Sequence, residues 1–320
     1  MRVFFDNGIV VVGRNFKILV DPFKSFDETK YDLVLITHGH SDHVTRHVKR
    51  AAAVLTRETL QVLSVREGVR PRRYFLARPG ERLDFGKFYV HVLNAGHVPG
   101  SVMYVVESPE GTLGLTGDFN TAGSNVVEGA DWIEADVLVM EATYGSRQYV
   151  FPPRDKIYGE ILSLVDSNKA PVAIRVGPLG KGQELARLLP HKRLWLDPKV
   201  ARLNRALGYA EGREYVRNAA LGPGEALVLS LTTRPPSGFL LVELSGHYAV
   251  SRPQGHLGLP LSNHSDFPGL LEAALRSRAK RIYTVYGRAE ELAKWLRRLG
   301  LNASKIPPRG QTELTQWLTP

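Results

Sequence analysis

The stretch Thr37-His38-Gly39-His40-Ser41-Asp42-His43 concentrates histidine and aspartate in one short segment. It directly follows residues 33–36, an apolar run of the kind that forms a buried strand. In an extended segment His38 and His40 project to the same side, and a turn at Ser41 directs the following aspartate and histidine toward the same point. Because the chain has no cysteine, a metal must be bound by histidines or carboxylates. The stretch therefore predicts a site for one or two metal ions at the end of a strand.

Polar side chains also follow three other expected strands. His97 and Asp118 each come just after such a strand, and the glycine before each permits a tight turn. Either residue alone would more often be an ordinary loop residue, but the neighbouring motif makes both candidate metal ligands. Asp21 ends a further strand; we expect it either to accept an N–H from a ligating histidine or only to cap the turn before Pro22.

Strands and helices are mixed along the whole chain. Before residue 141, the pattern predicts strands at 3–5, 9–12, 17–20, 33–37, 88–94, 102–107, 112–116 and 137–140, and helices at 41–52 and 57–65. The pattern breaks at 145–154, and strands at 171–176, 193–196 and 226–231 then alternate with helices at 181–189 and 199–207, as in a parallel sheet. Helices at 270–276 and 290–299 flank a last strand at 281–285.

The length and charge of the chain narrow the classes of function. Its 320 residues suffice for about two domains. No apolar run approaches the roughly 20 residues that span a membrane, and charged residues interrupt the N-terminal segment, so we expect no membrane association and a cytoplasmic location. Residues 1–150 carry 17 Lys and Arg against 18 Asp and Glu, whereas residues 151–320 carry 25 against 14. The basic part predicts an anionic partner, with a charged surface kept for solubility as the alternative.

The His38-x-His40-x-Asp42-His43 motif, together with Gly96-His97 and Gly117-Asp118, resembles the metallo-β-lactamase fold. That resemblance implies an α/β protein, a four-layer αββα sandwich with a dinuclear metal site at one sheet edge. Three further segments, 139–145, 261–266 and 285–287, resemble motifs A, B and C of the β-CASP nucleases. In that branch a Rossmann-like β-CASP domain is inserted in the sandwich, which implies a sandwich made of residues 1–150 and 256–320 with an insert at 151–255.

Within the β-CASP branch, the chain looks most like the ligase-associated DNA exonucleases and the archaeal RNA 3′-end processing factors. The resemblance implies a metal-dependent nuclease that hydrolyses phosphodiester bonds of single-stranded DNA or RNA, exonucleolytically, in repair or RNA 3′-end processing. A DNA ligase or RNA-processing proteins are the partners that it implies. Two alternatives remain: a small-molecule hydrolase of the same fold, which needs no basic insert, and a nucleic-acid-binding subunit without catalysis, in which metal ligands would be missing.

The resemblance also assigns roles to individual residues. One metal would be bound by His38, His40, His97 and Asp118, and a second by Asp42, His43 and the shared Asp118. Catalysis would rest on Asp42, His264 and Glu141, with His264 facing the scissile phosphate and Glu141 orienting it. The expected metal is zinc, one ion tight and one weaker, with manganese as an alternative. Tyr286 stands where RNA-cleaving relatives have a histidine ligand, and a neutral phenol is a poor ligand, so the second metal is the weaker one.

Substrate-binding residues are expected in and beside the insert. Gly180, Lys181 and Gly182 lie at the start of an expected helix, where backbone amides and the helix dipole favour phosphate. Ser245, Gly246 and Arg252 are the other candidates. For the two cations, exposure on a solvated surface is an equally good interpretation of the sequence.

Overall fold

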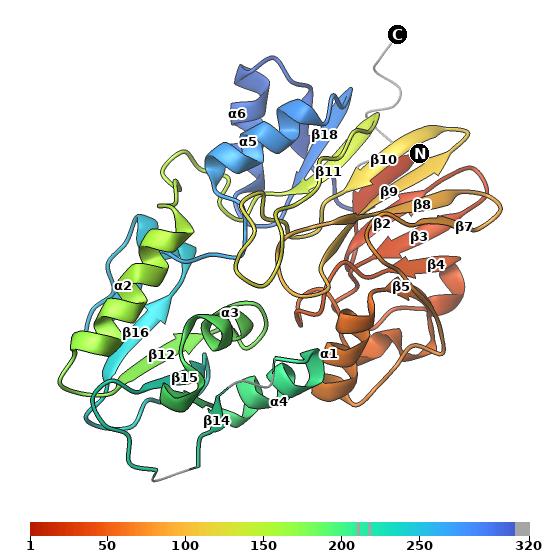
Figure 1. The fold of residues 1–320 in the computed structure, drawn as a ribbon. Coiled ribbons are helices and arrows are strands. Elements are labelled where there is room, and N and C mark those ends of the chain that lie inside the picture. Colours follow the sequence, from red (N-terminus) through yellow and green to blue (C-terminus); the bar gives the residue numbers. More distant parts are fainter. Residues whose placement is uncertain (210–211, 217–218, 311–320) are drawn as a thin grey trace.

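Two mixed sheets packed face to face form the main body of the molecule (Figure 1). The computed structural model describes residues 1–209, 212–216 and 219–310. In order across the sheet, the first contains β1 (Arg2–Phe5), β2 (Ile9–Val12), β3 (Lys17–Val20), β4 (Leu33–Leu35), β5 (Ala52–Leu55) and β6 (Arg73–Leu76). The second contains β19 (Ala303–Lys305), β18 (Arg281–Val285), β11 (Val137–Glu141), β10 (Gly111–Leu115), β9 (Val102–Ser108), β8 (Tyr89–Asn94) and β7 (Arg82–Asp84).

Buried side chains between the two sheets make the largest core, among them Ile18, Leu35, Tyr104 and Leu115. The outer face of the first sheet packs against α1 (Arg57–Glu67) and the short 3₁₀ helix η2 (Arg46–Arg50). The outer face of the second sheet packs against α5 (Phe267–Arg276) and α6 (Ala289–Arg298). This is the αββα sandwich that the sequence predicted. β18, from the C-terminal part of the chain, pairs with β11, and β19 pairs with β18. The N-terminal and C-terminal parts of the chain therefore build the same sandwich.

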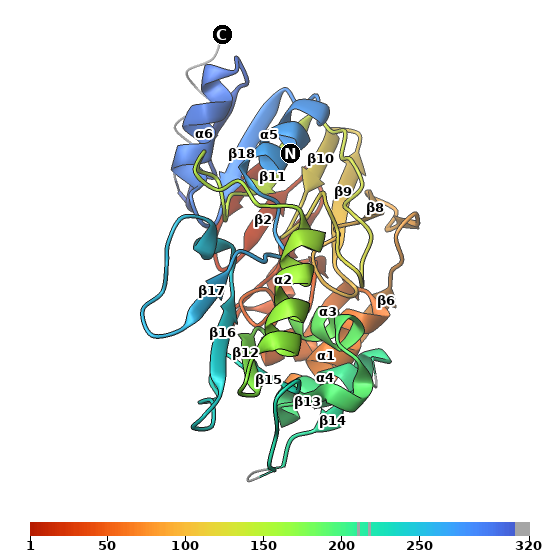
Figure 2. The same ribbon diagram turned by 60° about the vertical axis from the view of Figure 1, so that its left-hand side comes forward.

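A third sheet, parallel throughout, forms the inserted part (Figure 2). Its strands, in order across the sheet, are β14 (Arg213–Glu214), β13 (Leu194–Leu196), β15 (Ala226–Ser230), β12 (Val172–Val176), β16 (Leu240–Leu244) and β17 (Leu257–Leu259). Three helices pack against one face of this sheet: α2 (Arg154–Ser167), α3 (Lys181–Leu188) and α4 (Pro198–Leu207). Since β17 pairs with β16 beyond residue 255, we propose that the insert extends to about residue 260.

The insert is attached to the sandwich by an apolar contact as well as by its two connections. Val62 of α1 and Leu203 of α4 are buried in one small cluster with Val98 and Leu179. Two of these residues, Val98 and Leu179, adjoin the segments that carry candidate site residues. The contact therefore fixes the insert beside the edge of the sandwich where the strand-end loops lie.

One prediction about local structure was wrong, and one long helix was not predicted. Residues 41–52 do not form a helix: a single turn, with the amides of His43 and Val44 directed at the His40 carbonyl, precedes η2 and the strand β5. The β-branched and alanine-rich residues of β5 pair with β4 and β6 in the sheet, which outweighs their local helical pattern. The helix α2 was not predicted, because its sequence follows directly on a run of two prolines that indicates a loop.

Candidate active site

Four side chains of the types that ligate metals converge at one end of the two central sheets. They are His38 and His40 after β4, His97 after β8 and Asp118 after β10, and their donor atoms all lie within 4.8 Å of one another. His38 Nε2 is 3.0 Å from His40 Nδ1, and His97 Nε2 is 3.2 Å from the same His40 atom. Asp118 Oδ2 is 3.6 Å from His38 Nε2 and 3.7 Å from His97 Nε2.

The chemistry of these four groups fits a divalent cation. Burial, together with neighbouring histidines, holds the pKa of His38 and of His97 well below the usual range, and burial lowers the pKa of His40 to about 4. The three imidazoles are therefore neutral near pH 7 and keep a lone pair for a metal. Burial raises the pKa of Asp118, but the nearby His43 and His264 lower it by more. The net pKa of Asp118 therefore lies well below its usual range. Three imidazoles and one carboxylate form a donor set that zinc and similar ions accept.

His43 occupies the next position around Asp118. Its Nε2 is 3.4 Å from Asp118 Oδ2, and its Nδ1 is 2.9 Å from Asp21 Oδ2. The Asp21 carboxylate also accepts hydrogen bonds from the Thr37 amide (2.8 Å) and the Thr37 hydroxyl (2.6 Å). Asp21 therefore holds both the ring of His43 and the backbone of Thr37, the residue before His38, in fixed positions. Asp42 lies on the exposed side of the same turn; it lines the adjacent cavity but belongs to no group of donors within 4.8 Å.

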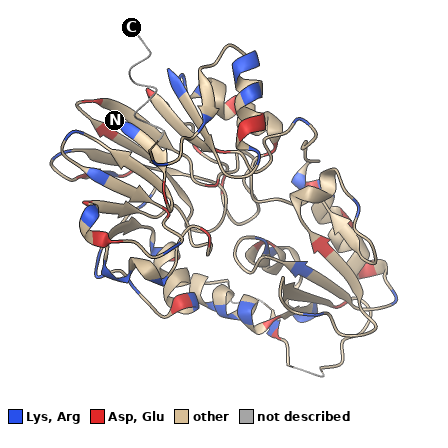
Figure 3. Cartoon of the chain, turned by 180° about the vertical axis from the view of Figure 1, so that it is seen from behind, with Lys and Arg blue, Asp and Glu red and all other residues tan. Residues whose placement is uncertain are grey.

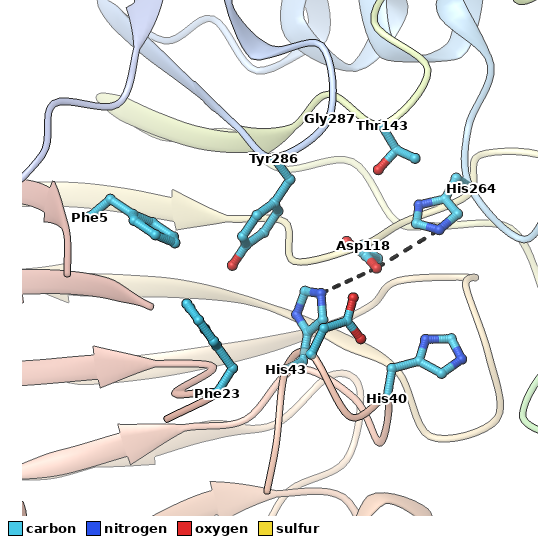
Figure 4. Close-up of a pocket in the computed structure, with 10 residues that line it drawn as sticks. Phe5, Phe23, His40, His43, Asp118, Thr143, His264, Tyr286 and Gly287 are labelled. Atoms are coloured by element: carbon cyan, nitrogen blue, oxygen red, sulfur yellow. Dashed lines mark ion pairs between the residues drawn. The ribbon is translucent and has the colours of Figure 1, made fainter. Parts of the chain in front are cut away.

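A cavity of about 410 Å³ opens beside these donors (Figure 4). One side carries His40, His43, Asp118 and His264, and the other carries Phe5, Phe23 and Tyr286 (Figure 4). Burial, together with the charge of Asp21, raises the pKa of Tyr286 well above its usual range, so its hydroxyl stays neutral. The centre of the Tyr286 ring is 5.3 Å from that of His43.

His264 and Glu141 form a second pair in this cavity. His264 Nδ1 is 2.9 Å from Glu141 Oε1 and 3.0 Å from Oε2, and its Nε2 is 3.9 Å from Asp118 Oδ2. The buried Glu141 also accepts a hydrogen bond from the Phe119 amide (2.9 Å), which holds the carboxylate in place. Burial lowers the pKa of His264, but Glu141 and Asp118 raise it more, and the net pKa lies above the usual range. The pair thus presents a positioned proton-bearing imidazole to the cavity.

The insert reaches the donors through residues near the start of α3. The Leu179 carbonyl is 3.4 Å from His40 Nε2, and Lys181 Nζ is 3.5 Å from Asn263 Oδ1. The Asn263 carbonyl is 2.8 Å from His97 Nδ1, and its side-chain amide donates to the buried Glu184 of α3. No role was predicted for Asn263 or Glu184 from the sequence, because their contact joins segments far apart in the chain.

The expected substrate-binding residues are only partly brought to the site. The Gly180 amide already donates to Gln183 Oε1 (2.7 Å), and Gly182 is packed so closely that a Cβ there would lie 3.0 Å from Val200. The Gly180 amide is therefore not the free donor that the sequence suggested, Gly182 packs against Val200 of α4, and Lys181 lies close to Asn263.

Ser245, Gly246 and Arg252 do not line the cavity beside the donors. Ser245 caps the 3₁₀ helix η4 (Gly246–Ala249) by accepting from the His247 amide (3.3 Å), and Gly246 packs against Tyr144. Arg252 is exposed.

In the part of the chain that the structure describes, no helix has the length and apolar character needed to cross a membrane.

The sandwich region matches a known family. Residues 6–141 match the family described as a beta-lactamase superfamily domain. Residues 6–141 therefore form a domain of the beta-lactamase superfamily. A solved structure from Enterococcus faecalis V583, titled as a protein of unknown function, superposes with a TM-score of 0.68 over 96% of this chain and 98% of that one, at 14% identity. This likeness shows that the two proteins share a fold over nearly the whole chain, insert included.

Relatives of this metallo-β-lactamase-fold chain act on nucleic acids, judging by their names. A probable DNA ligase from Opitutus terrae is 30% identical over 303 residues, which cover 87% of this chain and 29% of that protein. RNase aCSPSF2 from Saccharolobus solfataricus is 32% identical over 121 residues, which cover 35% of this chain and 24% of that protein. The chain thus spans less than a third of the length of these two relatives. The matches confirm the predicted resemblance to the β-CASP nuclease branch.

Proposed function

We propose that the protein is a metal-dependent nuclease that hydrolyses phosphodiester bonds of single-stranded DNA or RNA, acting exonucleolytically in repair or RNA 3′-end processing. The observation that carries the proposal is the juxtaposition of the four donors His38, His40, His97 and Asp118 with the His264–Glu141 pair in one cavity. The relatives named as a ribonuclease and a DNA ligase support it. A DNA ligase or RNA-processing proteins are the proposed partners, and the proposed location is the cytoplasm.

The proposed metal is zinc, with manganese as an alternative. His38, His40, His97 and Asp118 would hold one ion, and His43, Asp118 and Asp42 a second, weaker one. A divalent cation held there supplies Lewis acidity, which lowers the pKa of water and offsets negative charge on a phosphoryl oxygen.

The other roles belong to the side chains themselves. Glu141 keeps His264 protonated and aimed into the cavity, from which it can stabilise charge on the phosphate or give its proton to the leaving oxygen. Asp21 holds the Nδ1–H tautomer of His43, so that Nε2 faces Asp118. Lys181 extends from the insert toward the same region and is the proposed phosphate-binding cation.

Two alternatives fit the site less well. A small-molecule hydrolase has no use for the excess of basic residues in 151–320. This excess is divided between the insert and the C-terminal part of the sandwich, and Figure 3 shows Lys and Arg on both. A subunit without catalysis would lack metal donors, yet the four-donor group is complete.

The experiment that tests the proposal compares 5′-labelled and 3′-labelled single-stranded RNA and DNA, with zinc or manganese added. We expect the protein to shorten at least one of these strands, and product lengths to give the direction of cleavage. His40→Ala and Asp42→Asn should each lower the rate by at least about 100-fold, the effect of removing one transition-state stabilising group. Circular dichroism shows whether both variants remain folded. Near-normal cleavage by folded, metal-free Asp42→Asn protein would refute the proposal.

A further inference from the structure

One wall of the cavity beside the metal donors is aromatic. Phe5 ends β1, Phe23 lies in the loop after β3, and Tyr286 follows β18. The ring centres of Phe5 and Phe23 are 6.2 Å apart with nearly parallel planes, and those of Phe5 and Tyr286 are 6.1 Å apart. Figure 4 shows these rings on one side of the cavity and His40 and His264 on the other. The cavity thus joins an aromatic surface to the one that carries the metal donors.

Phe23 is the one aromatic residue of this wall that does not pack against a hydrophobic core cluster of the described residues. Phe5 and Tyr286 pack against the core between the two sheets, whereas Phe23 belongs to none of the hydrophobic core clusters found among the described residues. Its side chain is half-buried and lines the cavity, with Lys24 Nζ 5.4 Å from the ring centre. An aromatic ring placed in this way is available to a ligand rather than to the interior of the protein.

The loop that carries Phe23 is held at both ends. The Asn7 side chain accepts a hydrogen bond from the Lys24 amide (2.7 Å) and donates one to the Lys24 carbonyl (3.0 Å). Asp21, two residues before Phe23, is bonded to Thr37 and His43. The position of the ring relative to the metal donors is therefore fixed before any substrate binds, which lowers the entropic cost of binding.

We propose that Phe23, supported by Phe5 and Tyr286, is the stacking site for the nucleobase adjoining the scissile phosphate, an inference that rests on the proposed nuclease function. Every nucleobase presents a flat face, so stacking on such rings binds single strands with little sequence preference. The cavity volume of about 410 Å³ lies within the range of about 300–1,000 Å³ usual for small-ligand sites. Lys24, beside the ring, is placed to contact the phosphate on the far side of that nucleoside.

The test uses oligonucleotides in which one residue is abasic and the backbone is intact. With the unmodified protein, an abasic residue next to the cleaved bond should raise KM by about tenfold, the effect of losing one stacked base, with little change in kcat. Phe23→Leu, which keeps an apolar side chain but no ring, should bring KM for the intact strand close to that of the abasic one. Phe23→Trp should keep the preference for a base. The matched control is Phe75→Leu, because Phe75 lies exposed on β6 outside the cavity.

A second measurement keeps this inference separate from the nuclease proposal. Adenosine monophosphate should quench the fluorescence of the Phe23→Trp protein beyond any change in the unmodified protein, and ribose 5-phosphate should not. Equal KM for intact and abasic strands, or unchanged discrimination in Phe23→Leu, would overturn the stacking site while the nuclease proposal stands. Absence of cleavage together with base-dependent quenching would refute the nuclease proposal and keep Phe23 as a nucleobase-binding residue without a scissile phosphate beside it. Absence of quenching would overturn the stacking site.

Discussion

Four non-glycine residues of the described chain have left-handed backbone conformations: Asn7, Asp21, Arg278 and Tyr286. Asp21 and Tyr286, at φ values of 50° and 62°, lie beside the candidate metal site. Residues other than glycine adopt such angles at a cost of about 1–3 kcal/mol, which surrounding contacts must offset. For Asp21 those contacts are the bonds to Thr37 and His43. For Tyr286 they are the packing against Phe5 and His43. Both strained residues thus border the candidate metal site, as strained backbone commonly does.

Tyr286 leads to a prediction about metal binding. Its neutral phenol is a poor ligand, so the second proposed metal position relies on Asp42, His43 and Asp118. We expect the dialysed protein to keep about one zinc per chain, and Tyr286→His to raise this toward about two, because an imidazole completes a four-ligand set. Tyr286→Phe, which removes only the hydroxyl, is the control and should leave the value unchanged. Metal analysis after dialysis measures both; two tight equivalents in the unmodified protein would contradict the prediction.

At this scale, the sequence predicted the donors because their spacing is local. His38 and His40 share one side of an extended segment, and His97 and Asp118 follow strands that end at the same edge. Asn263 and Phe23 could not be found in this way, since each acquires its position through contacts with distant segments: Asn263 with Glu184, and the Phe23 loop with Asn7. The assignment of free amides to Gly180 failed because a side chain, Gln183, bonds that amide.

At the scale of single elements, α3 connects the insert to the site. Burial, partly offset by Glu184, lowers the pKa of its first residue, Lys181, to about 8. Lys181 is therefore charged below pH 8 and loses its charge as the pH rises through that value. Its attraction for phosphate should be present at neutral pH and lost in mildly alkaline solution.

This leads to a measurable pH dependence of substrate binding. An Asp118→Asn background, which should not cleave, allows binding of a labelled single strand to be followed by fluorescence anisotropy. Between pH 7 and about pH 9.5, affinity should fall by about tenfold, the loss of one charge-assisted contact of about 1.5 kcal/mol. Lys181→Arg should remove most of this fall, because a guanidinium stays charged throughout. Lys181→Gln should bind weakly at both pH values; an equal fall in all three proteins would show that another group titrates.

The elements that the sequence predicted well are those with strong local patterns. The strands β2 and β3 were predicted with their observed bounds, and α1 began at the expected residue. The helix α2 and the strands β6, β7, β14, β16, β17 and β19 were missed, and residues 41–52 were wrongly expected to be helical. For β5 and α2, tertiary contacts decide the conformation. β5 lies between β4 and β6, and α2 packs its apolar side on the third sheet.

For the whole molecule, the decisive property is the division of charge between the two parts of the chain. The first part is close to neutral, and the second holds 25 basic against 14 acidic residues. The insert contacts the sandwich through the packing of α4 on α1 and through Glu184 with Asn263, and Lys181 of α3 thereby lies near the metal donors. A single strand with one phosphate at the donors would therefore place its other phosphates near the insert.

This arrangement predicts a steep dependence of binding on salt. Each phosphate neutralised on a single strand contributes about −0.7 to the slope of log affinity against log salt concentration. Contacts to three or more phosphates should give a slope of about −2 or steeper between about 50 and 200 mM salt. Anisotropy titrations of a labelled single strand measure this slope, and Arg252→Gln tests one contributor: its slope should be less negative by about 0.7 if that exposed side chain meets a phosphate. An unchanged slope would place Arg252 outside the strand's path, whereas a flat response in the unmodified protein would favour a small-molecule substrate, because such a ligand has no phosphates beyond the cavity for the insert to neutralise.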